Sequence, residues 1–460
     1  MVHSNTFIRK LLVKYNRPVP RYTSYPTAPH FQYHLCQEAS RARLRAIPEN
    51  QSISLYIHIP FCRNLCLYCG CHTKVVDHEA PLSAYLKVVE QEIIMAARAI
   101  GRRQKVSHIH FGGGTPNFAP IKDIESLLRT ISGQFALDDH PVIAMEMDPR
   151  ILYQDKVRAL AKLGVNRVSL GVQDFQPDVQ QAVNRIQPYE FVRDCVHWLR
   201  SAGIRSINFD MIYGLPLQTP DKIHDNMEKL KTLSPDRVAL FGYAHVPWFK
   251  EHQKKLEVHR LPGTLDRFAM AETARRDLIK AGYTPIGIDH FAQPEDALAK
   301  ALKEKRLHRN FQGYTADHEP ILIGFGQTAI SDYGDAYVQN TDRNRDYRDA
   351  VMSGAFPITK ACLLSPEDIY RRSVIENIMC YGAVDLLSLD DANSWADFVW
   401  QSATPALAVF AKDGLVSLGD MEMTVTPMGR PLTRLMANAF DAYLQQSGQS
   451  IETPRHAKAV

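Results

Sequence analysis

Hydrophobic residues of this chain gather in short runs, and the stretches between them repeat apolar positions every three or four residues. The short runs are rich in Val, Ile, Leu and Phe, which is typical of parallel strands buried on both faces. In the stretch 81–100, Leu82, Leu86 and Val89 fall on one helical face. The predicted strands are 54–60, 106–112, 142–148, 167–173, 206–214 and 237–243.

Alternating strands and helices predict an α/β fold with a parallel sheet and right-handed crossovers. Six such units indicate an incomplete (β/α)6 barrel rather than the closed form with eight strands. The flanking segments differ, because 16–29 is rich in proline and the residues after about 350 are mainly helical in pattern. We therefore expect an N-terminal arm at 1–50, a catalytic barrel with an extension at 51–350, and a small, mainly α-helical C-terminal domain at 351–460 with one hairpin at 414–426.

Composition and charge narrow the class of protein. The 460 residues are 45% hydrophobic and 23% charged, which is ordinary for a globular protein. No apolar run reaches the ~18–20 residues of a membrane helix, and the first ten residues lack an apolar signal core. The net charge of +4 and the lack of a basic stripe argue against nucleic acid as a partner. We expect a cytoplasmic protein with reduced thiols, no membrane partner, and an anionic substrate held by a few local arginines.

Four of the eight cysteines lie within residues 62–71, and Cys62, Cys66 and Cys69 have the spacing CxxxCxxC. Three thiolates so close together can bind a cubic iron–sulfur cluster and leave its fourth iron open for a small molecule. A zinc site would need a second cysteine pair or a histidine pair, and disulfides are not expected in a reducing compartment. A fourth ligand, Cys71, would instead give an electron-transfer cluster of ferredoxin type.

Polar residues follow the predicted strands, at the end where active sites of parallel α/β folds lie. The glycine-rich segment 112–116 allows a ligand to approach the backbone closely. Glu146 and Arg185 suit the ammonium and carboxylate of an amino-acid moiety. Asp210 lies in an apolar strand and needs a partner, either a protein donor or a ribose hydroxyl.

Aromatic residues flank the cysteine loop. Tyr56 and Tyr68 could pack on an adenine ring or shield a reactive species from water. His58, His108 and His110 lack a metal-ligand spacing, and we interpret them as structural.

The cysteine spacing together with the glycine segment resembles the radical S-adenosylmethionine (SAM) superfamily. From about residue 10 to the C-terminus the chain further resembles the oxygen-independent coproporphyrinogen III oxidases, also called dehydrogenases. Cys71 and the arm argue against the related haem-chaperone branch, which looks to lack both. The matching segments are 14–16, 20–27, 62–71, 112–116, 146–150, 171–175, 184–185, 210–216, 243–245, 289–292 and 308–314.

The resemblance implies an oxidoreductase of haem (porphyrin) biosynthesis that converts two propionates of coproporphyrinogen III to vinyls and gives protoporphyrinogen IX. A reduced 4Fe–4S cluster would cleave SAM to methionine and a 5′-deoxyadenosyl radical, which takes a hydrogen from the propionate β-carbon. It also implies two SAM molecules per turnover and a reducing electron donor such as flavodoxin or ferredoxin. We expect a monomer.

The resemblance assigns roles to individual residues. It makes Cys62, Cys66 and Cys69 the cluster ligands and leaves Cys71 outside the ligand set. Tyr56, Glu146 and Arg185 are the expected catalytic residues, and Arg21 and Arg309 are candidates for binding substrate carboxylates. The first SAM site implicates Tyr56, Gly113, Glu146 and Ile330, and the second Tyr68, Gly114, Thr115, Gln173, Arg185, Asp210 and Ala244.

Two departures from the family pattern leave the substrate open. Ile288 stands where the family usually has methionine, and Tyr381-Gly382 follows Cys380 where asparagine is expected. The alternatives are a radical SAM paralogue that opens or methylates haem, a haem-binding chaperone on the same fold, and a ferredoxin-like electron carrier.

Overall fold

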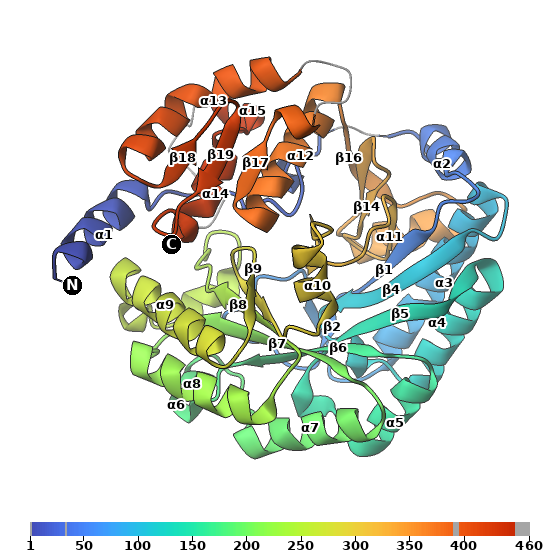
Figure 1. Cartoon of the computed structure of the whole chain (residues 1–460). Coiled ribbons are helices and arrows are strands. Elements are labelled where there is room, and N and C mark those ends of the chain that lie inside the picture. The colour runs from blue at the N-terminus through green and yellow to red at the C-terminus, as the bar shows by residue number, and fades with distance from the viewer. Residues whose placement is uncertain (1, 33–34, 390–394, 447–460) are drawn as a thin grey trace.

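The computed structural model describes residues 2–32, 35–389 and 395–446. The six predicted strands lie side by side in one sheet, each parallel to the next (Figure 1). All six begin and end within two residues of the predicted bounds, except that the third starts at Ala136. They are β1 (Ile53–Ile59), β4 (Lys105–Gly113), β5 (Ala136–Met147), β6 (Arg167–Gln173), β7 (Ser206–Tyr213) and β8 (Arg237–Gly242).

Six further strands extend this sheet at both edges, so it is larger than the sequence predicted. One of them, β13 (Leu322–Phe325), pairs parallel with β1. The strand order does not close on itself, which confirms the incomplete barrel. The other additions are antiparallel: β14 (Ile330–Asp332), β15 (Ala336–Asn340) and β16 (Ile358–Leu363) beyond β13, and β10 (His290–Ala292) and β9 (Thr284–Ile286) beyond β8.

Amphipathic helices cover the outer face of the barrel, as Figure 1 shows. The predicted helix at 81–100 is α3 (Ala80–Ile100), and its Leu82, Val89 and Ile93 are fully buried against the sheet. Burial of these apolar faces drives the barrel to form. The remaining barrel helices are α4 (Ile121–Gln134), α5 (Gln154–Lys162), α6 (Pro177–Ala182), α7 (Tyr189–Ser201), α8 (Pro220–Leu233) and α9 (Thr264–Lys280), and the extension adds α10 (Ala297–Lys303) and α11 (Asn344–Met352).

The C-terminal part builds a second hydrophobic core around Val374, Ile378 and Leu407. The predicted hairpin is confirmed, because β18 (Val416–Leu418) pairs antiparallel with β19 (Glu422–Val425). A third strand, β17 (Ala383–Asp385), joins the other side of β19. The helices of this part are α12 (Pro366–Tyr381), α13 (Trp395–Lys412), α14 (Thr433–Asn438) and α15 (Ala442–Gln446).

The N-terminal segment consists of α1 (Val2–Tyr15), an irregular stretch, and α2 (Gln37–Ala46). The irregular stretch joins the C-terminal core to the barrel. Tyr22 donates a hydrogen bond to Asp441 (2.9 Å), and Arg21 donates to the carbonyl of Gly242 at the end of β8 (2.9 Å).

Two short strand pairs complete the fold: β2 (Phe61–Cys62) with β3 (Lys74–Val75), and β11 (His308–Asn310) with β12 (Gly313–Thr315). No described helix has the length and apolar character needed to span a membrane.

Candidate active site

The cysteine loop follows β1 at the carboxyl end of the barrel. The glycine segment packs against it, because the Gly114 N–H donates to the carbonyl of Ile59 (2.9 Å) and the Thr115 N–H to that of Phe61 (2.8 Å). The Thr115 hydroxyl also donates to Cys62 Sγ at 3.2 Å. A Cβ at Gly114 would lie 2.8 Å from the Phe61 carbonyl oxygen, so glycine permits this contact. The two motifs therefore form one structural unit.

Positive charge surrounds Cys66. Arg185 Nη1 lies 3.4 Å and Arg150 Nη2 lies 3.6 Å from its Sγ. Guanidinium groups at this distance can pair with the negative charge of an iron-bound thiolate. Burial raises the pKa of Cys62 to about 12, whereas a hydrogen bond with Cys71 lowers that of Cys69 to about 6.

These thiols fit a cluster better than a single metal ion. Among the described residues, no three His, Cys, Asp or Glu side chains are arranged to hold one ion. A cubic cluster takes one cysteine per iron, so its three ligands need not meet at a point. Three thiols on one loop, two of them receiving hydrogen bonds, match that demand.

Glu146, at the end of β5, holds a negative charge beside the glycine segment. The Gly113 N–H donates to its Oε2 (3.0 Å), and His110 Nε2 lies 3.3 Å from Oε1. Burial alone would raise the pKa of Glu146, but the hydrogen bond and charge of His110 and the Gly113 N–H outweigh it, and the pKa is lowered. A Cβ at Gly112 would lie 2.8 Å from Glu146 Oε1 and from the Tyr56 ring. The carboxylate is therefore fixed in a form that can bind an ammonium group.

Arg185 is buried and held by the end of β6. Its Nη2 donates to the carbonyl of Gly171 (2.6 Å), and its Nη1 lies 3.3 Å from Asp148 Oδ2. Burial opposes its charge, but the neighbouring Tyr68, Asp148 and Cys66 outweigh burial and raise its pKa. Gln173, in a left-handed conformation (φ 66°), ends the same strand. Arg185 thus stays cationic next to Cys66.

Asp210 lies inside the barrel on β7 and has protein donors. Ser169 Oγ donates to Oδ2 and Asn208 Nδ2 to Oδ1, both at 2.8 Å. Burial raises its pKa to about 7.

The remaining predicted site residues lie around the same rim. Gln253 Nε2 donates to the carbonyls of Tyr68 (3.0 Å) and Ala244 (3.3 Å) and so joins the cysteine loop to the segment after β8. Ile330 begins β14, where its carbonyl oxygen would lie 2.6 Å from a Cβ at Gly324.

The sequence interpretation missed two histidines of this site. His110 pairs with Glu146, and His58 Nδ1 lies 3.0 Å from the Tyr56 hydroxyl. Burial lowers the pKa of His58 to about 4, so this imidazole is neutral. The two-residue alternation of strands places Tyr56 and His58 on one face of β1, and this signal could have identified His58.

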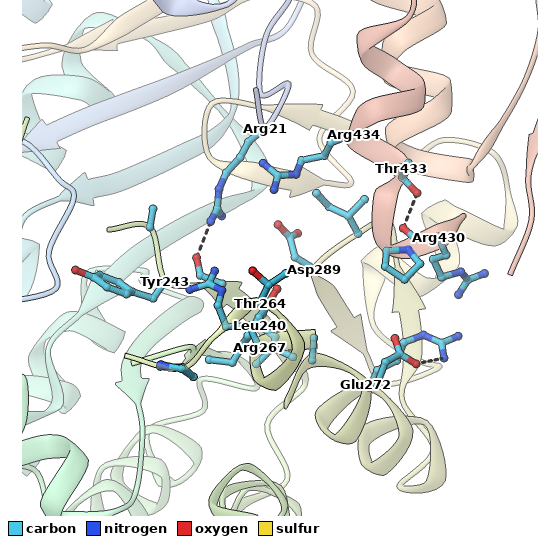
Figure 2. Close-up of a pocket in the computed structure, with 18 of the residues that line it drawn as sticks. Arg21, Leu240, Tyr243, Thr264, Arg267, Glu272, Asp289, Arg430, Thr433 and Arg434 are labelled. Carbon is cyan, nitrogen blue, oxygen red and sulfur yellow. Dashed lines mark hydrogen bonds and ion pairs between the residues drawn. The ribbon is translucent and has the colours of Figure 1, made fainter. Parts of the chain in front are cut away.

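The two candidate substrate arginines occupy different positions. The Arg21 guanidinium lies 5.6 Å from the centroid of the Phe241 ring, at the rim of β8. Arg309 is 3% exposed, donates to the carbonyl of Arg21 (3.2 Å), and lies 3.9 Å from Asp289. Arg21 lines a cavity of about 540 Å3 (Figure 2), whereas Arg309 does not. Ile288 also lines this cavity.

Comparison with known proteins identifies the superfamily of the barrel. The sequence model of the radical SAM superfamily matches residues 56–230, which include the second half of β1, the cysteine loop and the strands through β7. Motif and barrel together define a radical SAM fold.

The oxygen-independent coproporphyrinogen III oxidase of Bradyrhizobium diazoefficiens is 42% identical, over 96% of this chain and 97% of its own. That of Escherichia coli K12 is 38% identical over 95% and 96%. The solved structure of coproporphyrinogen III oxidase from Escherichia coli, described as a radical SAM enzyme, superposes with a TM-score of 0.88 at 37% identity and covers 92% of this chain and 97% of that one. The chain belongs to the oxygen-independent coproporphyrinogen III oxidase family.

Proposed function

We propose that this protein oxidatively decarboxylates two propionates of coproporphyrinogen III to vinyl groups and so forms protoporphyrinogen IX in haem biosynthesis. The observation that carries the proposal is the meeting of the cysteine loop, the glycine segment and Glu146 at one end of the barrel, in a chain similar to such oxidases over nearly its full length. Each conversion removes CO2, one hydrogen atom and one electron from a propionate.

The cofactors we infer are a 4Fe–4S cluster on Cys62, Cys66 and Cys69, and two SAM molecules. Bound together, they supply the radical chemistry that removes hydrogen from an unactivated carbon. Glu146 would bind the ammonium of the first SAM, with Tyr56, Gly113 and Ile330 around it. Arg185 would bind the carboxylate of the second, together with Tyr68, Gly114, Thr115, Gln173, Asp210 and Ala244.

The chain itself prepares this chemistry. Arg150 and Arg185 compensate the negative charge that cluster binding places on Cys66. The Tyr56, His58 and His110 side chains fill the barrel beside Glu146, which keeps water from the reacting carbon.

We further propose that residues 1–50 form an arm over the site, 51–350 the catalytic barrel, and 351–460 a domain that completes the substrate cavity. The enzyme would work as a cytoplasmic monomer with a reducing partner such as flavodoxin or ferredoxin. Arg21 would contact the substrate, and Arg309 would support it through the arm backbone.

The test is an anaerobic turnover assay of the reconstituted enzyme with coproporphyrinogen III, SAM and a reductant, read by mass spectrometry. We expect protoporphyrinogen IX and two 5′-deoxyadenosines per substrate, as two decarboxylations require. SAM cleavage without decarboxylation would indicate a paralogue acting on another tetrapyrrole. Loss of all SAM cleavage with an intact cluster would indicate a binding protein.

A further inference from the structure

The cavity at the end of β8 is built from three distant parts of the chain. Its walls come from the N-terminal arm, from α9 with the segment around Asp289, and from the start of α14 in the C-terminal part, as Figure 2 shows. Its volume of about 540 Å3 falls within the range of sites for small organic ligands. Trp248, Ile288 and Phe291 give it an apolar surface.

Positive charge exceeds negative charge in this cavity. Five arginines line it, but only two carboxylates, Glu272 and Asp289. Both carboxylates already have partners, because Glu272 lies 4.0 Å from Arg275 and Asp289 lies 2.7 Å from His290 Nδ1. Asp289 also faces the buried Arg309 behind the cavity wall (3.9 Å). The cavity is therefore complementary to an anion.

Two arginines that line the cavity, Arg267 on α9 and the exposed Arg430, form no side-chain hydrogen bond or ion pair among the described residues. The Arg267 guanidinium lies over the Tyr213 ring, 5.8 Å from its centroid. Burial and the nearby charge of Arg21 both act to lower its pKa. Burial and then Arg21 likewise lower the pKa of Arg434, to about 10, although Arg434 donates to the carbonyl of Val19 (3.2 Å). The charge of Arg21 thus repels both the Arg267 and the Arg434 guanidinium groups.

The segment that forms one wall of the cavity continues to the cysteine loop. Ala244, His245 and Trp248 line the cavity, and the next residues reach the loop. Lys250 Nζ donates to the carbonyl of Cys71 and His252 Nε2 to that of Cys69, both at 2.8 Å. A ligand in the cavity is therefore separated from the cysteine loop by one segment of chain.

We propose that this cavity anchors a carboxylate-bearing side chain of the tetrapyrrole, with Arg267 as the specificity-determining residue and Arg21 and Arg434 beside it. This inference rests on the proposed function. The substrate carries four carboxylates, and two of them persist in the product, so the enzyme needs a site that holds carboxylates without reacting. The planar guanidinium forks match a carboxylate, and the apolar wall matches the macrocycle.

The test compares Arg267→Gln with Arg276→Gln in the reconstituted full-length enzyme. Arg276 lies on the same helix but is 67% exposed and pairs with Asp277, outside the cavity. We expect Arg267→Gln to raise KM for coproporphyrinogen III about tenfold, as the loss of a charge-assisted contact predicts. Its kcat and SAM affinity should stay near those of the wild type, and Arg276→Gln should change nothing. Arg267→Lys, which keeps the charge but loses the fork, should lie between them.

Direct binding provides a second readout. Coproporphyrin III, the oxidised and fluorescent form, should bind the wild type with an affinity that falls as salt rises, and Arg267→Gln should weaken both the affinity and its salt dependence. If the wild type is active and a folded Arg267→Gln has the same KM and the same porphyrin affinity, the inference about the cavity is overturned and the proposed function stands. A wild type that cleaves SAM without decarboxylating coproporphyrinogen would overturn the proposed function instead. If Arg267→Gln does not fold, the inference is tested instead by the KM of Arg267→Lys and by the salt dependence of coproporphyrin III binding to the wild type.

Discussion

The cysteine loop and the arginine cavity are neighbours, but the chain builds them in opposite ways. The proposed cluster ligands lie within eight residues, and backbone hydrogen bonds from the adjacent strand end hold them. The cavity arginines come from the arm, from α9 and from residues 430–434, which meet only in the folded protein. On the proposed roles of the two regions, radical chemistry is encoded locally, whereas substrate selection depends on tertiary assembly. Changes in the two regions should therefore have separable effects.

The largest effect is expected from Cys66→Ser. Cys66 is one of three proposed ligands and the one with two arginines around it, so its loss should remove the cluster. We expect iron content and the visible absorbance to fall to background after reconstitution, and SAM cleavage to vanish.

Cys71→Ser is the matched control, because Cys71 is an exposed cysteine of the same loop. It should keep its iron and its absorbance. Loss of the cluster in Cys71→Ser would make Cys71 a ligand and favour an electron carrier.

A smaller effect is expected from Arg21→Ala. The arm places this guanidinium on the Gly242 carbonyl at the cavity rim, and its removal should raise KM for coproporphyrinogen III by about tenfold. SAM cleavage without substrate should be unaffected. Arg17→Ala, an exposed arginine on the same arm, provides the control in steady-state assays. Equal KM values for the two variants would remove Arg21 from the substrate site.

Gln253→Leu tests the connection between the two regions. Gln253 is fully buried and bonds the Tyr68 and Ala244 carbonyls, and leaving such groups unpaired costs about 1–3 kcal/mol. We expect a melting temperature lower by a few degrees, faster loss of iron in air, and a KM raised several-fold. Lys255→Leu, on an exposed neighbour, should match the wild type. A change in iron retention alone would show that the two regions are independent.

The barrel was predictable because a short apolar run marks each of its strands, although β6 and β7 alternate buried and partly exposed residues instead of being buried on both faces. β6 has the predicted bounds, since the apolar run and the strand coincide at Arg167–Gln173. β5 begins six residues earlier than predicted, because its first half contains the exposed Asp138, Asp139 and His140. The strands of the extension are short and antiparallel, and they leave no comparable apolar signal.

Site residues were predictable only where a strand end or a motif marks them. Glu146 and Asp210 stand out because they end or interrupt apolar strands. Arg267 and Arg434 do not, because an arginine on an amphipathic helix has the pattern of a solvated face. Only the packing of the arm and the C-terminal part against the barrel turns these arginines toward one cavity.

The smallest expected effect concerns the pKa values of two carboxyl groups, Asp289 at the cavity and Asp210 inside the barrel, which shift in opposite directions. Burial would raise the pKa of Asp289, but the hydrogen bond with His290 and the charge of Arg309 outweigh it and lower the pKa. Burial prevails at Asp210 and raises its pKa from 3.8 to about 7. Between pH 3.8 and about 7, Asp210 keeps its proton in the folded protein but has lost it in the unfolded chain. The contribution of Asp210 to the free energy of unfolding therefore falls as pH rises through this range.

Asp210→Asn removes this titration while keeping the shape of the side chain. The melting temperature of the wild type should therefore fall more between pH 5 and pH 8 than that of the variant, by on the order of a few degrees in calorimetry without SAM. The difference should level off above about pH 7, where Asp210 is ionised in both states. Parallel curves for the two proteins would mean that burial does not raise the pKa of Asp210 in the folded protein.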